Sequence, residues 1–400
     1  MRHAVILDYV RTPFTRAADP TSGKAPGQMA HVDPIDMVAL LTRTLLERNK
    51  VDPAKVENLV LGCVHQEAEQ GLNPARMAVL HKDSGLPNNV QGDSLDKFCA
   101  SAARAIAVAR NDILAGDAEL IMAGGVQSMS RVPMGGWNGL VNKNVYDGHV
   151  KNFMNMGATA ENLAGIYNVS RNEQEVFALD SHRKMAAAQQ AGHYNDEIVP
   201  VDGVALDDNV RTDSTPETLA KLKPAFKENG SVTAATSSPL TDGAALVLMA
   251  SEDFAKANNL PVLARIIASA GSGCDPETMG LGPVESSRKA LERAGLTMED
   301  IDVVELNEAF AAQVLAVMKE WENQGMKVAP EKLNIDGGAI ALGHPLGASG
   351  ARLVGHASRI LQRTDKRYAL ATMCVGQGQG FAVVIENPHA SKQAAPQLKP

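Results

Sequence analysis

A cysteine near the start of a helix is the first side chain in this sequence that could perform chemistry. Cys99 stands in the segment 96–101 (DKFCAS), directly before a strongly helical stretch. The N-terminus of a helix stabilises negative charge, so we expect it to lower the pKa of this thiol and favour a thiolate nucleophile. The alternative is that Cys99 is a small, buried hydrophobic residue.

A histidine lies in the most glycine-rich part of the chain. The segment 334–350 (NIDGGAIALGHPLGASG) surrounds His344 with glycine turns and leads into an amphipathic helix. Glycine lets the backbone approach a ligand closely, and a histidine between Gly343 and Pro345 is held in a crowded position. Such a histidine suits a hydrogen bond to a developing oxyanion, although a structural histidine in the core is the alternative.

Two further candidates follow apolar strands. Cys374 precedes the segment 375–380 (VGQGQG), and because a strand follows rather than a helix, a dinucleotide site is not indicated. This thiol could act as an acid or base near an enolate, or it could simply be buried. Asn307, in 307–310 (NEAF), is either a helix N-cap or an amide that positions a water molecule or the histidine.

Alternating strands and helices must position these residues. Apolar runs predict strands at 3–8, 58–63, 119–123, 245–250, 264–268, 302–306, 368–374 and 382–386. Helical patterns are predicted at 34–49, 74–84, 100–115, 173–191, 284–294, 309–324 and 349–363. This alternation predicts a layered α/β architecture.

The chain also contains an internal repeat. Asn89 opens a segment similar to the one that Asn334 opens, and each Asn precedes a candidate residue by ten positions: 99 − 89 for Cys99 and 344 − 334 for His344. Two similar halves packed face to face would bring both residues to one shared interface. Between the halves, residues 124–238 are irregular, which is typical of a segment that covers a substrate.

Composition limits the class of protein. The chain has 400 residues, a net charge of −8 and 44% hydrophobic residues, which argues against nucleic acid as a partner. No segment approaches the roughly 20 apolar residues that span a bilayer. Cys63 and Cys274 complete a set of isolated cysteines without a C-x-x-C pair, so we expect no metal site and a reducing cytoplasmic location.

The order of these motifs resembles that of the thiolase superfamily. The motifs are the cysteine before a helix, the NEAF segment, the Gly-His-Pro segment and the Cys-x-Gly segment. The resemblance runs from Arg11 to Ile385. It implies an α/β thiolase fold with two similar βαβαβαββ halves in a five-layer αβαβα arrangement and an inserted loop domain. The implied domains are 1–120 with 240–269, the insertion at 121–239, and 270–400.

The same resemblance implies an activity. Thiolases are acyltransferases that cleave 3-ketoacyl-CoA with CoA, giving acetyl-CoA and a shortened acyl-CoA. By similarity, Cys99 would be acylated, His344 would activate it, and His344 with a water held by Asn307 would stabilise the enolate oxygen. Cys374 would exchange the proton at the acetyl carbon, and the N–H groups of Cys99 and Gly376 would stabilise the tetrahedral intermediate.

The resemblance also implies where CoA would bind. Because CoA acts as a substrate, we expect no cofactor. The residues implied to contact CoA are Arg211, Lys221, Phe226, Ser238 and Phe310. Nearby lysines, Lys223 and Lys227, could bind the CoA phosphates, or they could belong to a solvated helix face.

The exact reaction stays open at this stage. Segments 62–71, 236–243 and 371–380 look like those of bacterial 3-ketoacyl-CoA thiolases of fatty acid beta-oxidation. The alternative is a biosynthetic acetyl-CoA C-acetyltransferase, and a non-catalytic acyl-CoA binder or a condensing synthase is a more distant one. Thiolases form homodimers or homotetramers, and degradative ones often associate with a hydratase/dehydrogenase subunit.

Overall fold

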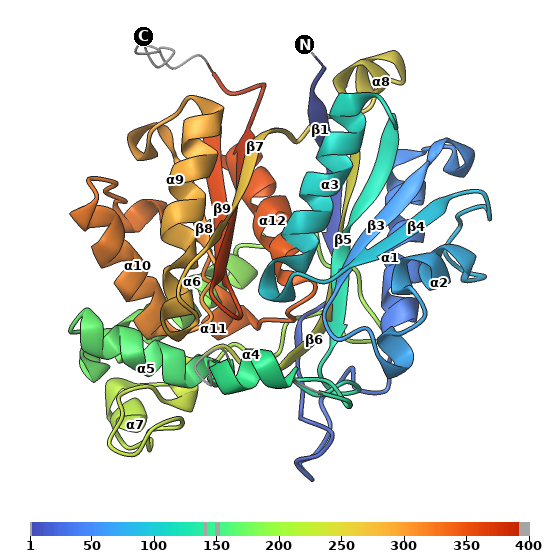
Figure 1. The fold of residues 1–400 in the computed structure, drawn as a ribbon. Coiled ribbons are helices and arrows are strands. Elements are labelled where there is room, and N and C mark those ends of the chain that lie inside the picture. The colour runs from blue at the N-terminus through green and yellow to red at the C-terminus, as the bar shows by residue number, and fades with distance from the viewer. Residues whose placement is uncertain (1, 140–141, 149–152, 392–400) are drawn as a thin grey trace.

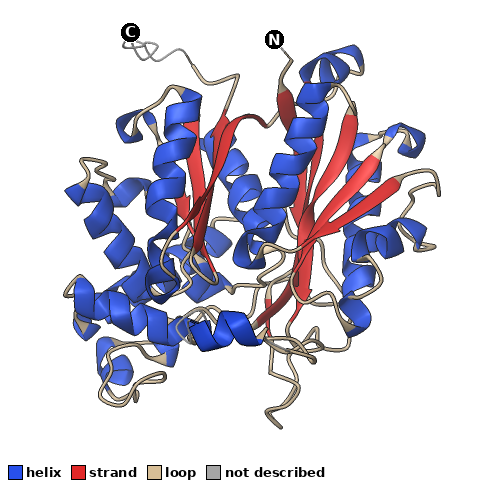
Figure 2. Ribbon diagram, in the orientation of Figure 1, coloured by secondary structure: helices blue, strands red, loops and turns tan. Residues whose placement is uncertain are grey.

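The computed structural model describes residues 2–139, 142–148 and 153–391 and shows two sheets between three layers of helices (Figures 1 and 2). The strands are β1 (Ala4–Arg11), β2 (Thr15–Arg16), β3 (Asn58–Cys63), β4 (Gln91–Leu95), β5 (Leu120–Ser128), β6 (Thr241–Ser251), β7 (Ala264–Gly273), β8 (Val303–Leu306), β9 (Tyr368–Val375) and β10 (Gln379–Glu386). The helices are α1 (Pro34–Asn49), α2 (Pro74–Leu80), α3 (Ser101–Ala115), α4 (Lys143–Gly148), α5 (Met156–Ile166), α6 (Arg171–Gln190), α7 (Pro216–Ala220), α8 (Glu252–Ala257), α9 (Gly282–Ala294), α10 (Ala311–Asn323), α11 (Ala339–Leu342) and α12 (Ser349–Thr364).

The strand order reveals the two halves. The N-terminal half forms β4-β3-β5-β6-β1, and the C-terminal half forms β7-β10-β9-β8. These two parts, called here the N-terminal and C-terminal sheets, form one continuous ten-stranded sheet, because Val5 and Ile6 of β1 pair with Arg265 and Ala264 of β7; β2 pairs with β6 beside this order. Helices α1 and α2 cover one outer face, α9 and α10 cover the other, and α3 and α12 lie between the sheets. The layered α/β architecture predicted from the sequence is confirmed.

Small residues allow the central layer to pack closely. The buried face of α3 consists mostly of alanine, and the strands on either side are almost wholly buried. A Cβ atom added at Gly350 of α12 would lie 2.3 Å from the backbone nitrogen of Ala103 in α3, and one at Gly62 of β3 would lie 2.4 Å from the carbonyl carbon of Ser101. These contacts hold the first turns of α3 and α12 against each other and against the N-terminal sheet.

The segment between β5 and β6, residues 129–240, is named here the β5–β6 insertion. It contains α4 to α7, of which α4, α5 and α7 lie along the lower side of the molecule in Figure 1. Although it belongs to the N-terminal half by sequence, α5 packs against α10, and α6 packs against α10 and α11. The insertion therefore covers one end of the C-terminal half. Because β5 runs to Ser128, the first residues of the predicted 121–239 domain belong to the sheet, and the predicted domain boundaries stay a prediction.

A buried ionic network joins the N-terminal half, the insertion and the C-terminal half. Arg11 of β1 donates to Glu197 at 2.7 Å and to both oxygens of Asp207 at 2.6 and 2.8 Å. Glu197 also lies 2.9 Å from Nδ1 of His356 in α12, and His356 pairs with Asp336. Burial alone would raise the pKa of Glu197, but His356 and Arg11 lower it to about 2.

Within the described residues, no helix is long and apolar enough to cross a membrane. The last nine residues of the predicted C-terminal domain, 392–400, lie outside the described part of the chain.

Candidate active site

Cys99 lies in a tight turn between β4 and α3. A short helical turn, Phe98–Ala100, leads into α3, and Phe98 has a φ of 46°, in the left-handed region that a bulky residue rarely adopts. The turn is held by hydrogen bonds from the backbone N–H of Phe98 to Asp96 at 2.7 Å and of Lys97 to Ser101 at 2.8 Å. Ser101 in turn donates to the carbonyl of Phe98 at 2.7 Å. The strained turn places the nucleophile candidate at the N-terminus of α3, as the sequence predicts.

The state of the Cys99 thiol differs from the prediction. Burial raises the pKa of Cys99 to about 11, although backbone N–H groups of Gly376 and of Cys99 itself, hydrogen-bonded to the sulfur, act in the opposite direction. The predicted lowering by the helix N-terminus was therefore wrong in its net direction, because desolvation outweighs it. The thiol is therefore protonated before the reaction, and a base has to take its proton when the sulfur attacks.

His344 is buried in the turn that precedes α12. Gly343 before it has a φ of 114°, and a Cβ atom there would meet Thr241 at 2.5 Å, so this turn requires glycine. The backbone N–H of His344 donates to the hydroxyl of Thr241 at 3.1 Å. Burial and the charge of Arg352 lower the pKa of His344 to about 3. The imidazole is therefore neutral near pH 7 and can accept a proton.

Ser349 fixes which nitrogen of His344 carries the proton. Its Oγ lies 2.6 Å from Nδ1 of His344 and also donates to the carbonyl of Pro345 at 2.9 Å. Since a hydroxyl has one proton, and the carbonyl accepts it, Nδ1 must donate to Ser349. The Nε2 atom is thus unprotonated, and its lone pair can accept a hydrogen bond or a proton. The sequence analysis missed Ser349; its place in the first turn after His344 was the available signal.

Asn307 contacts Nε2 of His344. Its Nδ2 lies 3.3 Å from Nε2, its side chain is fully buried, and its Oδ1 has no hydrogen-bond partner among the residues that the structure describes. An unpaired buried acceptor is costly, so this oxygen is suited to a water molecule or a ligand group. Asn307 is not a side-chain N-cap, because α10 begins at Ala311 with Phe310 as its N-cap residue.

Glu308, the neighbour of Asn307, links the two turns on which Asn307 and His344 stand. Its carboxylate accepts hydrogen bonds from Ser181 at 2.6 Å, from Asn334 at 2.8 Å and from the backbone N–H of Ile340 at 3.2 Å. Burial raises its pKa, and those donors oppose the rise. The sequence analysis included Glu308 in the NEAF segment but gave it no role. These contacts join the segment that carries Asn307 to the segment that leads to His344.

Cys374 ends β9 beside Cys99. Burial raises the pKa of Cys374 well above its ordinary value, and the nearby thiols of Cys99 and Cys274 add to the effect. The side chain packs in a cluster with Phe310 of the C-terminal half and with Ala160 of α5 in the insertion. A Cβ atom at Gly376 would lie 3.6 Å from the ring of Phe98 and 3.9 Å from the sulfur of Met156. The structure therefore brings together Cys99, Cys374, Gly376 and the start of α5.

The link to His344 is indirect. Cys99 and His344 share no hydrogen bond among the described residues. They lie in the turns that precede α3 and α12, and Asn307 connects His344 to β9, because the backbone N–H of Asn307 donates to the carbonyl of Thr372 at 3.0 Å. Cys374 lies two residues further along that strand. The shared interface predicted from the repeat is therefore built from both halves.

Three of the predicted CoA contacts also come together. Phe226 and Phe310 meet edge to face with ring centroids 5.7 Å apart, and the backbone N–H of Ser238 donates to the carbonyl of Ala309 at 3.0 Å. A Cβ atom at Gly157 would lie 2.1 Å from the Phe226 ring, so glycine is needed for this ring to pack on α5. The cluster lies beside the NEAF segment.

Arg211 and Lys221 are placed differently. Both are exposed, and no contact joins either of them to the Phe226–Phe310 pair among the described residues. The backbone N–H of Arg211 donates to His182 at 3.2 Å, and Lys221 is the C-cap of α7. Lys223 and Lys227 instead flank Phe226 in an open pocket of about 420 Å³ formed by residues 223–229, which also include the carboxylate of Glu228. These two lysines place positive charge next to the aromatic pair.

Comparisons with known proteins agree with this arrangement. A model of the thiolase N-terminal domain matches residues 4–253, and one of the thiolase C-terminal domain matches residues 260–387. The 3-ketoacyl-CoA thiolase of Aliivibrio fischeri is 42% identical over 402 residues, which cover 97% of this chain and 100% of that protein. The beta-ketoadipyl-CoA thiolase of Escherichia coli is 42% identical over 412 residues, covering 96% and 100%.

A solved structure confirms the fold. The acetyl-CoA acetyltransferase of Bacillus anthracis superposes with a TM-score of 0.86 at 36% sequence identity, covering 96% of this chain and 99% of that one. Two matching family models that together span nearly the whole chain, full-length relatives and this shared fold lead to one conclusion. The chain belongs to the thiolase family and is an acyltransferase with the thiolase fold.

Proposed function

We propose that this chain catalyses the CoA-dependent thiolytic cleavage of 3-ketoacyl-CoA to acetyl-CoA and a shortened acyl-CoA, as a 3-ketoacyl-CoA thiolase of fatty acid beta-oxidation. The observation that carries the proposal is the meeting of Cys99 from one half with the Gly376 N–H and the Cys374 thiol from the other. Carbon–carbon cleavage needs a nucleophile, a donor to the oxyanion and an acid for the carbanion, and these groups supply all of them.

In the first half-reaction, the sulfur of Cys99 attacks the 3-keto carbon while its proton passes to Nε2 of His344. The N–H groups of Cys99 and Gly376 stabilise the resulting oxyanion. The bond between carbons 2 and 3 then breaks, and the electron pair forms the enolate of acetyl-CoA. The protonated His344 and a water on Asn307 hold the enolate oxygen, while Cys374 donates its proton to carbon 2. The neutral His344 and the unpaired Oδ1 of Asn307 support these roles.

In the second half-reaction, the acyl group on Cys99 passes to CoA. The Cys374 thiolate takes the proton of the CoA thiol, and the CoA sulfur attacks the acyl carbon. The Cys99–acyl bond breaks, and His344 returns its proton to Cys99. Both cysteines and the histidine end in their starting states, so the cycle balances.

The insertion provides a platform for CoA. Phe310 shares an apolar cluster with Cys374 and packs against Phe226, while Lys223 and Lys227 offer charge to phosphate groups. All three related proteins described above carry a CoA thioester in their names. Arg211 and Lys221 stay proposed CoA contacts. CoA is a substrate in this reaction, and we propose no separate cofactor.

The alternative is a biosynthetic acetyl-CoA C-acetyltransferase, which the likeness to the Bacillus anthracis enzyme supports. Both activities use the same catalytic groups, and only the acyl chain differs. We further propose a cytoplasmic homodimer or homotetramer, which could associate with a hydratase/dehydrogenase subunit.

A substrate profile tests the proposal. Thiolysis rates would be measured for acetoacetyl-CoA, medium-chain 3-ketoacyl-CoA and beta-ketoadipyl-CoA with the purified chain. We expect medium-chain substrates to be cleaved with a kcat/KM at least equal to that for acetoacetyl-CoA. Cys99→Ser should lower kcat on the order of 10⁴-fold, whereas Cys63→Ser, a buried cysteine in β3, should leave it unchanged. Activity confined to acetoacetyl-CoA would reject the degradative assignment.

A further inference from the structure

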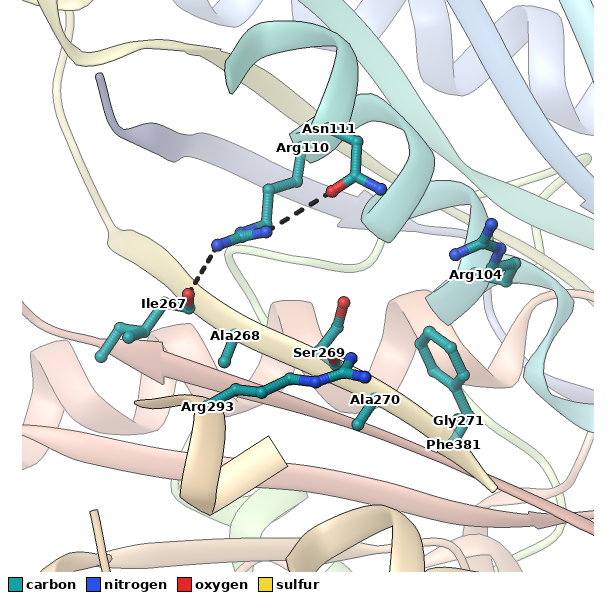
Figure 3. Close-up of a pocket in the computed structure, with 10 residues that line it drawn as sticks. All are labelled: Arg104, Arg110, Asn111, Ile267, Ala268, Ser269, Ala270, Gly271, Arg293 and Phe381. Carbon is teal, nitrogen blue, oxygen red and sulfur yellow. Dashed lines mark hydrogen bonds between the residues drawn. The ribbon is translucent and has the colours of Figure 1, made fainter. Parts of the chain in front are cut away.

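A second cavity lies away from Cys99, between α3 and the C-terminal sheet. It has a volume of about 230 Å³ and is bordered by α3 on one side and by β7, β10 and the end of α9 on the other (Figure 3). The lining residues are Arg104, Arg110, Asn111, Ile267, Ala268, Ser269, Ala270, Gly271, Arg293 and Phe381. None of them belongs to the site proposed for thiolysis.

The charge of this cavity is entirely positive. Its charged lining residues are Arg104, Arg110 and Arg293, and no aspartate or glutamate lines it. None of these arginines forms an ion pair with a carboxylate among the described residues. Arg288, on the same helix as Arg293, behaves differently, since it pairs with Glu285 at 2.7 Å and Glu292 at 3.2 Å. A cluster of unpaired cations is unusual in a chain with a net charge of −8.

Two of the arginines are held in place by β7. Arg110 donates to the carbonyls of Ile266 at 3.0 Å and Ile267 at 2.7 Å, and Arg293 donates to that of Ser269 at 2.6 Å. Peptide carbonyls orient a guanidinium group without neutralising its charge. The third nitrogen of Arg110 also contacts the side-chain oxygen of Asn111 at 3.5 Å, whereas Arg293 keeps its other N–H groups for a ligand. Their positions are thus set before any ligand arrives, which lowers the entropy cost of binding.

Arg104 completes the cluster from α3. Its side chain is exposed and has no described hydrogen bond or ion pair, so it can move towards a ligand. Burial and the charge of Arg104 lower the pKa of Lys97, which shows that positive charge accumulates at this end of α3. Lys97 itself is bound to Gln379 at 2.7 Å.

We propose that this three-arginine cavity binds a small oxyanion of the phosphate type. Guanidinium forks match the spacing of phosphate oxygens and form paired, charge-assisted hydrogen bonds with them. The cavity is smaller than the roughly 300–1,000 Å³ of pockets that hold drug-sized ligands, so it accepts the anion and not a whole coenzyme. The site is separate from the CoA platform, which lies on the insertion.

Thermal unfolding of the full-length protein with inorganic phosphate tests the proposal. The measurements would be made with saturating CoA, so that the CoA phosphate subsites are filled, and against sodium chloride at equal ionic strength. We expect phosphate, at about ten times its Kd, to raise Tm by about 2 °C relative to chloride. The variant Arg104→Gln/Arg293→Gln should lose this rise, whereas Arg288→Gln should keep it, because Arg288 lies outside the cavity.

Further variants guard against a folding defect. Arg104→Gln removes only an exposed side chain without a described partner, so it should fold normally and still lose most of the rise, and Arg104→Lys should recover part of it. An equal rise in the wild type and the double variant would overturn the proposal, as would equal effects of phosphate and chloride. A third contrary outcome combines no effect of phosphate on Tm with a changed oligomeric mass of the double variant. It would show that the arginines bind an acidic side chain of a second copy of the chain.

Discussion

Helices α3 and α12 lie side by side in the central layer, but they position their active-site residues by different means. The buried face of α3 is almost wholly apolar, and Cys99 at its start is held by a strained backbone turn and by close glycine contacts. The buried face of α12 carries Ser349, Arg352 and His356, each with a hydrogen bond or ion pair to another segment.

The difference fits the chemistry that each helix serves. A nucleophile needs an exact position and free space in front of it, which packing supplies without adding polar groups. A base needs a defined tautomer and a defined charge, which only hydrogen bonds and nearby charges supply. The two helices therefore meet different requirements by packing and by polar contacts, and three experiments test this difference.

The largest expected effect concerns the ionisation of Cys99. Because burial raises its pKa to about 11, the thiolate fraction should rise roughly tenfold per pH unit between about pH 7 and 10, without a plateau near neutral pH. The ultraviolet absorbance of the thiolate, taken as the difference between the wild type and Cys99→Ser, measures this rise. A midpoint below about pH 8 would show that the N-terminus of α3 ionises the thiol unaided, and the comparison with α12 would fail.

The second effect concerns the glycine contact between the helices. Gly350→Ala should force α3 and α12 apart, because its Cβ atom would lie 2.3 Å from the backbone of Ala103, and it should lower the free energy of unfolding by about 1–3 kcal/mol. The matched control is Gly165→Ala in α5, where nothing lies within 4 Å of the added atom. That variant should be neutral or slightly stabilising. Urea titrations of both variants measure the difference, and equal stabilities would contradict close packing as the support of α3.

The smallest effect concerns the tautomer of His344. Ser349→Ala removes the acceptor for Nδ1 and should lower kcat about tenfold by leaving that N–H unpaired. Ser358→Ala is the matched control, since Ser358 is also buried on α12 and donates to the carbonyl of Gly355 but does not touch His344. The Ser358→Ala variant should lower Tm and leave kcat unchanged. Comparing kcat with Tm in both variants separates positioning from packing, and equal kcat values would show that Ser349 does not orient the ring.

Much of the architecture could be predicted from the sequence because strong patterns encode it. The helix at 34–49 was placed correctly, since Asp33 caps it, Pro34 begins it and Lys50 ends it in the left-handed conformation. Strand β4 was missed, because Gln91–Leu95 is polar and forms a half-exposed edge of the sheet. The helix predicted at 74–84 ends at Leu80, since residues 81–84 form turns instead.

The residue types of the site could be predicted from the sequence, but the contacts that position these residues could not. Glycine density drew attention to His344, and the repeat related it to Cys99. The contacts of Ser349 and Glu308 depend on three-dimensional folding, and no periodicity reveals them. Likewise, the net pKa of Cys99 depends on burial, which a local motif does not encode. Arg104 and Arg293 are 189 residues apart (293 − 104), so their cavity could not be foreseen.

The ionic network around Arg11 and Glu197 has a consequence for the stability of each half. Its members come from β1, the insertion and α12, so dividing the chain between β6 and β7 would separate Glu197 from His356, whereas Arg11 and Asp207 would stay with Glu197. Losing one member of such a buried pair typically costs about 3–5 kcal/mol, a large share of the stability of a protein. We therefore expect each half, produced as a separate chain, to be less stable than the same half within the whole molecule.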